Sequence, residues 1–156
     1  MSDMTQSMEN ISIKLAKSFK NLVILNADSV VEYGLSQFSK FFDERHFTFG
    51  LGYSNMLSAA AGMTVRGKIP LVVVDSDGVL GAVKQIKESI CVPNLNVKMV
   101  AFNCSSDSYD YKIIKELPNM KVYSPVHGEE LLENLEQALN NFGPAYIRIS
   151  DNVLAE

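Results

Sequence analysis

Short apolar runs alternate with amphipathic stretches along most of the chain. Residues 21–26 read Asn-Leu-Val-Ile-Leu-Asn, and such a run is typical of a strand buried on both faces of a sheet. In the stretch 11–19, apolar residues recur at helical spacing while lysines fall on the other side, which predicts a helix. The same signals predict further strands at 46–51, 70–74, 97–102, 121–125 and 145–149. They predict further helices at 30–42, 55–65, 79–89, 110–116 and 129–141, with a turn at 75–78.

This alternation defines the expected fold class. It repeats about six times without a linker or low-complexity break, which is typical of an α/β domain with helices on both faces of a parallel sheet. We predict a single three-layer, doubly wound domain over residues 1–156, with a mainly parallel sheet of about six strands and a flexible tail at 1–8. Ligands of such sheets bind where strands end, here at loops 26–29, 50–55, 75–78, 103–109 and 124–128.

Charge and composition narrow the possible partners. The formal net charge of −4 argues against a nucleic-acid surface, which needs concentrated positive charge. We find no apolar run long enough to cross a membrane and no apolar signal core near the N-terminus, so we expect a cytoplasmic protein without a membrane partner. Cys91 and Cys104 form no Cys-x-x-Cys pair, and His46 and His127 lie far apart, so the sequence predicts no metal site.

The stretch 49–63 carries the most distinctive chemistry. Its apolar strand leads into a glycine turn, and the turn opens a helix with a polar start and a body of small residues. Glycines let the backbone bend tightly and let a ligand or a partner backbone come close. The free N–H groups at a helix start can hold an anion or a polar ligand. The small residues of the helix also predict close packing against a second subunit.

This stretch resembles a motif of transketolase-type, thiamine diphosphate-dependent enzymes, Gly-x-Ala-Glu-Gln-Asn-Met followed by small residues and Ala-Gly. Residues 50–56 read Gly-Leu-Gly-Tyr-Ser-Asn-Met, and Ala61-Gly62 closes the segment. Other landmarks of the family's pyrimidine-binding domain follow in order: Ala-Asp at 27–28, Gly-Lys-Ile-Pro at 67–70, Leu-Pro-Asn-Met-Lys-Val at 117–122 and Gly-Pro-Ala-Tyr-Ile-Arg at 143–148. The resemblance implies the thiamin diphosphate-binding fold over most of the chain.

The resemblance also assigns site residues. It implies that Gly52, Tyr53, Asn55 and Gly78 face the cofactor. It implies substrate contacts for Asp28, Asp110 and His127, and it places Ser105 or Ser106 where the family has a histidine. Each residue also has an ordinary structural interpretation: helix caps for Asn55 and Asp28, packing for Tyr53, a turn histidine for His127 and a solvated loop around Asp110.

Two of these positions depart from the family where its chemistry is performed. Tyr53 replaces the glutamate that activates the aminopyrimidine ring, and Gly78 replaces a phenylalanine that stacks on that ring. A phenol titrates near pH 10, so at neutral pH it donates a hydrogen bond but relays protons poorly. We therefore assign no catalytic residue to this chain.

The resemblance covers only the central domain of three in such enzymes. The resemblance assigns the diphosphate and its magnesium ion to another domain, which we do not expect within these 156 residues, so thiamine diphosphate with Mg²⁺ is expected only in a complex, or not at all. A homodimer or a hetero-oligomer with a diphosphate-binding subunit is expected.

Two functions remain open. The first is one subunit of a split, thiamine diphosphate-dependent ketol-transfer enzyme. The second is a non-catalytic structural or regulatory homologue that keeps the fold and the dimer surface. A generic nucleotide-binding domain is a weaker alternative, since no Gly-x-Gly-x-x-Gly or Walker-type loop follows a strand.

Overall fold

The computed structural model describes residues 3–27, 33–105, 107 and 109–150. Its strands are β1 (Leu22–Asn26), β2 (His46–Thr48), β3 (Ile69–Asp75), β4 (Lys98–Cys104), β5 (Lys121–Tyr123) and β6 (Ala145–Ser150). Its helices are α1 (Asp3–Ser18), α2 (Ser36–Phe41), α3 (Tyr53–Thr64), α4 (Ser76–Gly81), α5 (Val83–Ile86), α6 (Tyr109–Ile114) and α7 (Gly128–Asn140), with a 3₁₀ turn η1 (Asp43–Arg45) and a π-helical turn η2 (Lys87–Cys91). No helix of the described residues is long and apolar enough to span a bilayer.

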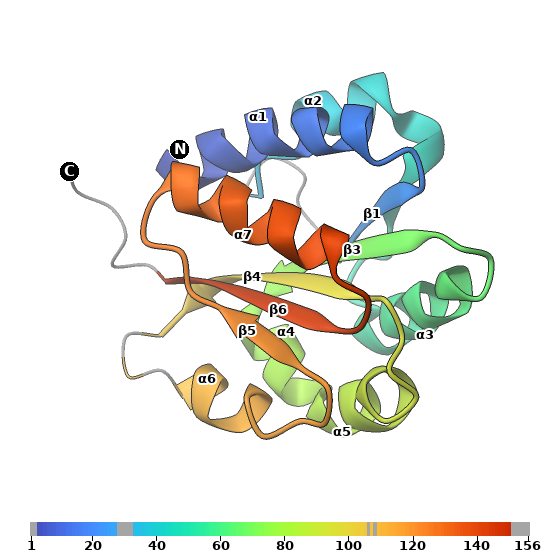
Figure 1. Ribbon diagram of the computed structural model, residues 1–156, viewed down its shortest axis with the longest axis vertical. Helices are drawn as coiled ribbons and strands as arrows, with labels where there is room; N and C mark the ends of the chain where they lie inside the picture. The colour runs from blue at the N-terminus through green and yellow to red at the C-terminus, as the bar shows by residue number, and fades with distance from the viewer. Residues whose placement is uncertain (1–2, 28–32, 106, 108, 151–156) are drawn as a thin grey trace.

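The strands form one fully parallel sheet in the order β2-β1-β3-β4-β6-β5. Helices α1, α2 and α7 cover one face, and α3 to α6 cover the other (Figure 1). Two apolar cores fill the spaces between the layers, one on each face of the sheet. This is the predicted three-layer α/β fold, and it is confirmed. The chain order reverses beside β1, because β2 pairs on one side of it and β3 on the other, and ligands of such sheets collect at that point.

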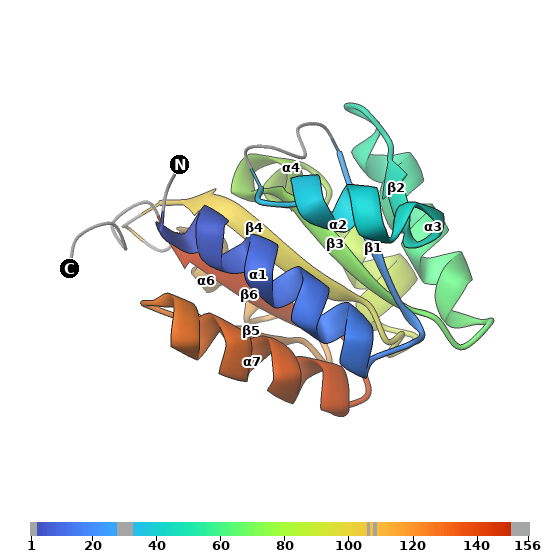
Figure 2. The same cartoon turned by 90° about the horizontal axis from the view of Figure 1, so that it is seen from above.

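The predicted flexible tail is wrong for the residues that the structure describes. Residues 3–18 form the single helix α1, which runs beside α7 (Figure 2). Met4 and Met8 are 1% and 0% exposed and extend the apolar stripe that continues at Ile11 and Leu15. The segment was predicted as a tail because polar residues separate the two methionines, although the spacing of the apolar residues is helical.

The helix predicted at 30–42 is much shorter, because residue 34 leaves helical geometry. Gly34 has a φ of +65°, and helix α2 begins only at Ser36. A Cβ atom at Gly34 would lie 2.0 Å from the backbone oxygen of Thr5 in α1, so only glycine allows this approach. Residues 28–32 of the prediction lie outside the described residues.

The turn predicted at 75–78 is also wrong beyond its first residue. Ser76 starts helix α4, so Asp77 and Gly78 lie in the first helical turn after β3. Asp75 precedes that helix in an extended conformation, and its side chain makes no capping hydrogen bond. Its carboxylate instead accepts hydrogen bonds from the Tyr33 hydroxyl at 2.6 Å and from the Asn103 amide. These two bonds tie the end of β3 to the segment before α2 and to the end of β4.

Lys98 is a buried charge at the start of β4. It is 1% exposed, and its Nζ donates hydrogen bonds to the carbonyl oxygens of Asn141 (2.8 Å) and Gly143, just beyond α7. Burial, helped by the charge of Lys121, lowers the pKa of Lys98 from 10.5 to about 8. Below pH 8 the ammonium is charged in both the folded and the unfolded chain, and the cost of burying it is fully present.

This shift predicts a rise in stability at alkaline pH. Between about pH 8 and 10.5 the unfolded chain binds more protons at Lys98 than the folded chain, so the free energy of unfolding increases with pH. The increase is on the order of 3 kcal/mol, at about 1.4 kcal/mol per pKa unit. Urea unfolding of wild type and Lys98→Met at pH 7.5 and pH 9.5 captures about 2 kcal/mol of this increase, and the comparison isolates it because other groups titrate in both proteins. An identical pH dependence in the two proteins would contradict the burial of a charged Lys98.

Candidate functional site

The loop after β2 and the start of α3 build one wall of the candidate site. Gly50 has a φ of +59°, which reverses the chain before the helix. Helix α3 starts at Tyr53, two residues earlier than predicted, and the Met56 amide closes its first turn on the carbonyl of Gly52 (2.9 Å). Gly52 precedes the helix without a side-chain cap. Tyr53 is therefore the first residue of the helix, and the closed first turn fixes the backbone from which its side chain projects.

The opposite wall comes from the first turns of α4. A pocket of about 520 Å³ lies between these two elements. Its lining comprises Leu51, Gly52, Tyr53, Ser54, Asn55, Asp77, Gly78, Gly81 and Ala82. The structure therefore brings together all four residues that the resemblance places against the cofactor.

Within this pocket, the ring of Tyr53 lies directly against the backbone of Gly78. A Cβ atom built on Gly78 would lie 2.5 Å from Cε1, 2.7 Å from Cζ and 3.0 Å from Cδ1 of that ring. These separations are shorter than any normal carbon–carbon contact, so the ring occupies the volume that a side chain at 78 would need. The half-buried ring also packs on the apolar core between the sheet and α3.

Residues 53 and 78 do not fit a cofactor that needs an acid and a stacking ring from them. Residue 53 carries a phenol, and residue 78 carries no side chain. The ring at 53 fills the space in front of position 78. Asp77 is the carboxylate that lines the same pocket, from α4 and not from α3.

Asp110 lies in a different environment, a buried ion pair. It is 1% exposed, and its carboxylate accepts hydrogen bonds from Arg148 Nε (3.0 Å), Arg148 Nη2 (2.9 Å) and the Tyr146 hydroxyl (3.0 Å). Burial alone would raise the pKa of Asp110, but the hydrogen bonds and charge of Arg148 outweigh it, so the pKa lies below its ordinary value. Arg148 also donates to the carbonyl of Ser105 (3.0 Å), which anchors the loop after β4. In this conformation Asp110 holds the fold together and is closed to a substrate.

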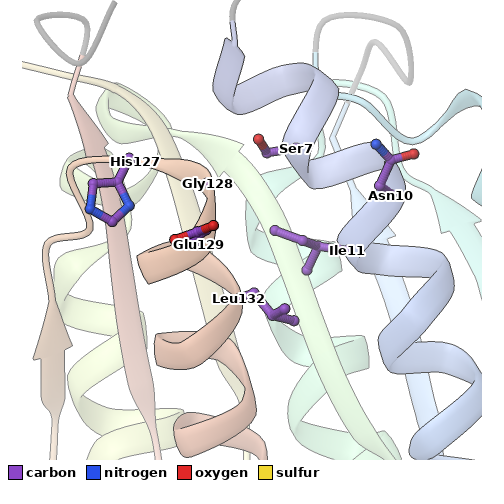
Figure 3. Close-up of a pocket in the computed structure, with 7 residues that line it drawn as sticks. All are labelled: Ser7, Asn10, Ile11, His127, Gly128, Glu129 and Leu132. Carbon is purple, nitrogen blue, oxygen red and sulfur yellow. The ribbon is translucent and has the colours of Figure 1, made fainter. Parts of the chain in front are cut away.

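His127 caps helix α7. Its Nδ1 accepts a hydrogen bond from the Glu130 amide at 3.3 Å, and the Glu130 carboxylate accepts one from the Val126 amide at 2.8 Å. This arrangement resembles a capping box with histidine in the usual Ser or Thr position, except that the Glu130 carboxylate binds the amide of Val126 and not that of the cap residue His127. His127 also lines a separate pocket of about 470 Å³ between the starts of α1 and α7 (Figure 3).

Asp28 lies outside the described residues. The structure therefore places Asp110 and His127 away from the pocket around Tyr53 and leaves the position of Asp28 open.

Sequence reasoning missed a polar cluster at the ends of β1 and β2. Asn26 is fully buried, and its Oδ1 accepts a hydrogen bond from Thr48 (3.1 Å) and lies 2.7 Å from His46 Nε2. Asparagine at the end of an apolar run was the available signal, because a buried amide needs partners.

The sheet order, the two helical layers and a pocket at the carboxyl ends of the strands define a doubly wound α/β domain that offers a ligand site where its strands end. By sequence and fold, the chain corresponds to the pyrimidine-binding domain of the transketolase-like family. No family model matches the chain. Two curated relatives and one solved structure illustrate the kinship.

A putative transketolase C-terminal section from Methanocaldococcus jannaschii is 31% identical over 148 residues, covering 88% of this chain and 47% of that protein. A 1-deoxy-D-xylulose-5-phosphate synthase from Pelotomaculum thermopropionicum is 29% identical over 153 residues, covering 92% of this chain and 24% of the synthase. A solved split-gene transketolase, described as an inactive β4 tetramer, superposes with a TM-score of 0.84 at 31% identity, covering 93% of this chain and 50% of that one. The chain thus spans between about a quarter and a half of the length of these relatives.

Proposed function

We propose that this chain is the pyrimidine-side subunit of a two-chain transketolase-like assembly, and that it is non-catalytic, acting as a structural or regulatory partner. The observation that carries the proposal is the Tyr53 ring packed on Gly78. That contact fills the place of the missing aromatic side chain and leaves no carboxylate at the family's acid position. The relationship to separately encoded transketolase chains supports the two-chain arrangement. One such relative, from Actinobacillus succinogenes, is named as a subunit of an apulose-4-phosphate transketolase and is 27% identical over 156 residues.

The surface around α3 supports pairing with a second chain. The helix exposes small and polar residues at Ser54, Asn55, Ser58 and Gly62. A Cβ atom built on Gly62 would contact nothing within 4 Å. Leu51, just before the helix, is 78% exposed. Small residues beside an exposed leucine allow the backbone of a partner to approach closely. The partner in this proposal is a second copy of the chain or a diphosphate-binding subunit.

A second candidate function is a working ketol-transfer subunit, and the position of Asp77 favours it. Its carboxylate lines the same pocket as Tyr53 and Asn55 and could replace the lost glutamate. In this candidate the chain binds thiamine diphosphate with Mg²⁺ only in complex with a diphosphate-binding subunit.

Calorimetric titration separates the two candidates. Thiamine diphosphate with Mg²⁺ is titrated into the purified chain, and then into the chain mixed with the diphosphate-binding chain of the same organism, after sedimentation has shown whether the two associate. We expect no binding heat from this chain alone. We also expect the mixture to give no more heat than the diphosphate-binding chain by itself, because the pocket lacks the acid at position 53 and the stacking ring at position 78. Heat that appears only in the assembly, and that Asp77→Asn abolishes, would favour the ketol-transfer candidate.

A further inference from the structure

The contact between Tyr53 and Gly78 joins two residues that lie on different helices, α3 and α4. The three nearest atoms to a Cβ built on Gly78 are all ring carbons of Tyr53, at 2.5 to 3.0 Å. Gly81, in the same helix as Gly78, has nothing within 4 Å of its own Cβ position. The restriction is therefore specific to residue 78 and is not a general property of α4.

Beneath the ring lies an apolar chamber at the sheet surface. Tyr53 and Gly78 form its outer boundary, and its remaining volume is only about 10 Å³. Its other walls are Met56, Leu57, Val72, Val74, Val79, Ile86 and Met99. On its outer side the same ring lines the open pocket of about 520 Å³. The ring thus separates a solvent-facing pocket from the apolar core, as a bound aromatic ligand would.

We propose that Tyr53 is a built-in occupant of an aromatic subsite, and that Gly78 is the residue that admits it. Positions 53 and 78 then form one coupled unit, in which a ring at one position requires the absence of a side chain at the other. A planar ring from a ligand enters this subsite only when the Tyr53 side chain is removed or displaced. The inference deepens the proposed non-catalytic function, on which its functional meaning rests, while the coupling rests on the geometry alone.

A double-mutant cycle followed by thermal unfolding tests the coupling. In wild type we expect Gly78→Ala to lower Tm by about 4 °C or more, because the new methyl group overpacks against the ring. In the Tyr53→Ala background the three ring carbons nearest to the new methyl group are gone, and we expect Tm to rise by about 2 °C, since alanine favours a helix over glycine. Gly81→Ala is the matched control and raises Tm in both backgrounds.

The sign reversal at position 78 is the decisive observation. Equal effects of Gly78→Ala in the two backgrounds would overturn the proposal. Tyr53→Leu provides a second background if Tyr53→Ala folds poorly, because a leucine side chain does not reach as far as the phenol. A hydrogen bond of Tyr53 is removed by Tyr53→Ala whether or not the chain also carries Gly78→Ala, and it cancels from the coupling when Gly78→Ala leaves that bond in place.

A small-molecule probe tests the subsite itself. The probe is p-cresol, which has the shape of the tyrosine side chain, and an apolar cavity left by truncating a side chain can bind such a ring. We expect p-cresol to raise the Tm of Tyr53→Ala by several degrees and to leave wild type unchanged. Binding to both proteins equally, or to neither, would overturn the subsite. The Tm measurements are made without thiamine diphosphate. If calorimetry detected binding of the cofactor, the proposed non-catalytic function would be contradicted, but the coupling of Tyr53 and Gly78 would stand.

Discussion

Arg148→Met is expected to lower the free energy of unfolding by about 3–5 kcal/mol, which corresponds to roughly 10 °C in Tm for a chain of this length. The arginine makes two of the three side-chain hydrogen bonds that Asp110 accepts from Tyr146 and Arg148. Without it, a carboxyl group that is 1% exposed loses its counter-ion and either stays charged in an apolar site or takes up a proton, and both cost stability. The loop after β4 also loses its bond from Arg148 to the Ser105 carbonyl. Urea and thermal unfolding of the purified variant measure the loss.

Two control variants separate the buried pair from a general effect of charge removal. Arg148→Met combined with Asp110→Leu removes both charges and should recover much of the lost stability, since an apolar pair of similar volume can replace a buried ion pair. Glu136→Gln breaks the exposed pair with Lys14, whose side chain is 57% exposed, and should cost less than about 1 kcal/mol. A loss for Arg148→Met no larger than that of Glu136→Gln would show that the buried pair contributes little.

The parallel sheet could be predicted because its central strands consist of unbroken apolar runs. Leu71, Val72 and Val73 in β3 are all fully buried, as a strand covered on both faces requires. The short outer strand β2 was predicted too long, since it ends at Thr48 and the chain reverses at Gly50. Apolar residues there face outward, and Phe47 is 38% exposed, so hydrophobicity alone did not indicate where pairing stops.

Elements that depend on distant contacts could not be predicted in the same way. The break before α2 requires the approach of Gly34 to the backbone of Thr5, and no local signal in the sequence encodes that approach. Helix α4 begins with Ser, Asp and Gly, which are ordinary turn residues, and so it resembled a loop. The methionines of α1, by contrast, were a readable signal, because Met4, Met8, Ile11 and Leu15 share one helical face.

The candidate site was only partly accessible from the sequence. The resemblance placed Gly52, Tyr53, Asn55 and Gly78 in one site, and the structure brings them into one pocket. The contact of the Tyr53 ring with Gly78 depends on how the start of α3 lies against α4, which no sequence pattern specifies. The resemblance implied two separate losses, an acid and an aromatic ring, whereas the structure shows Tyr53 and Gly78 as a single packed pair.

Exchange of the thiazolium C2 proton of thiamine diphosphate tests the central claim most directly, because it reports activation of the cofactor without requiring a known substrate. It is measured by deuterium incorporation, with this chain and the diphosphate-binding chain of the same organism in excess over the cofactor and Mg²⁺. The control is Tyr53→Glu, which restores a carboxylate at the start of α3 and should speed exchange by on the order of 100-fold, the usual size of a general acid–base contribution.

For the wild-type chain we predict exchange no faster than that of the diphosphate-binding chain and cofactor alone, because position 53 presents a ring packed on Gly78 and no acid. Acceleration on the order of 100-fold or more by wild type would contradict the account, and its loss in Asp77→Asn would identify the carboxylate that had taken over.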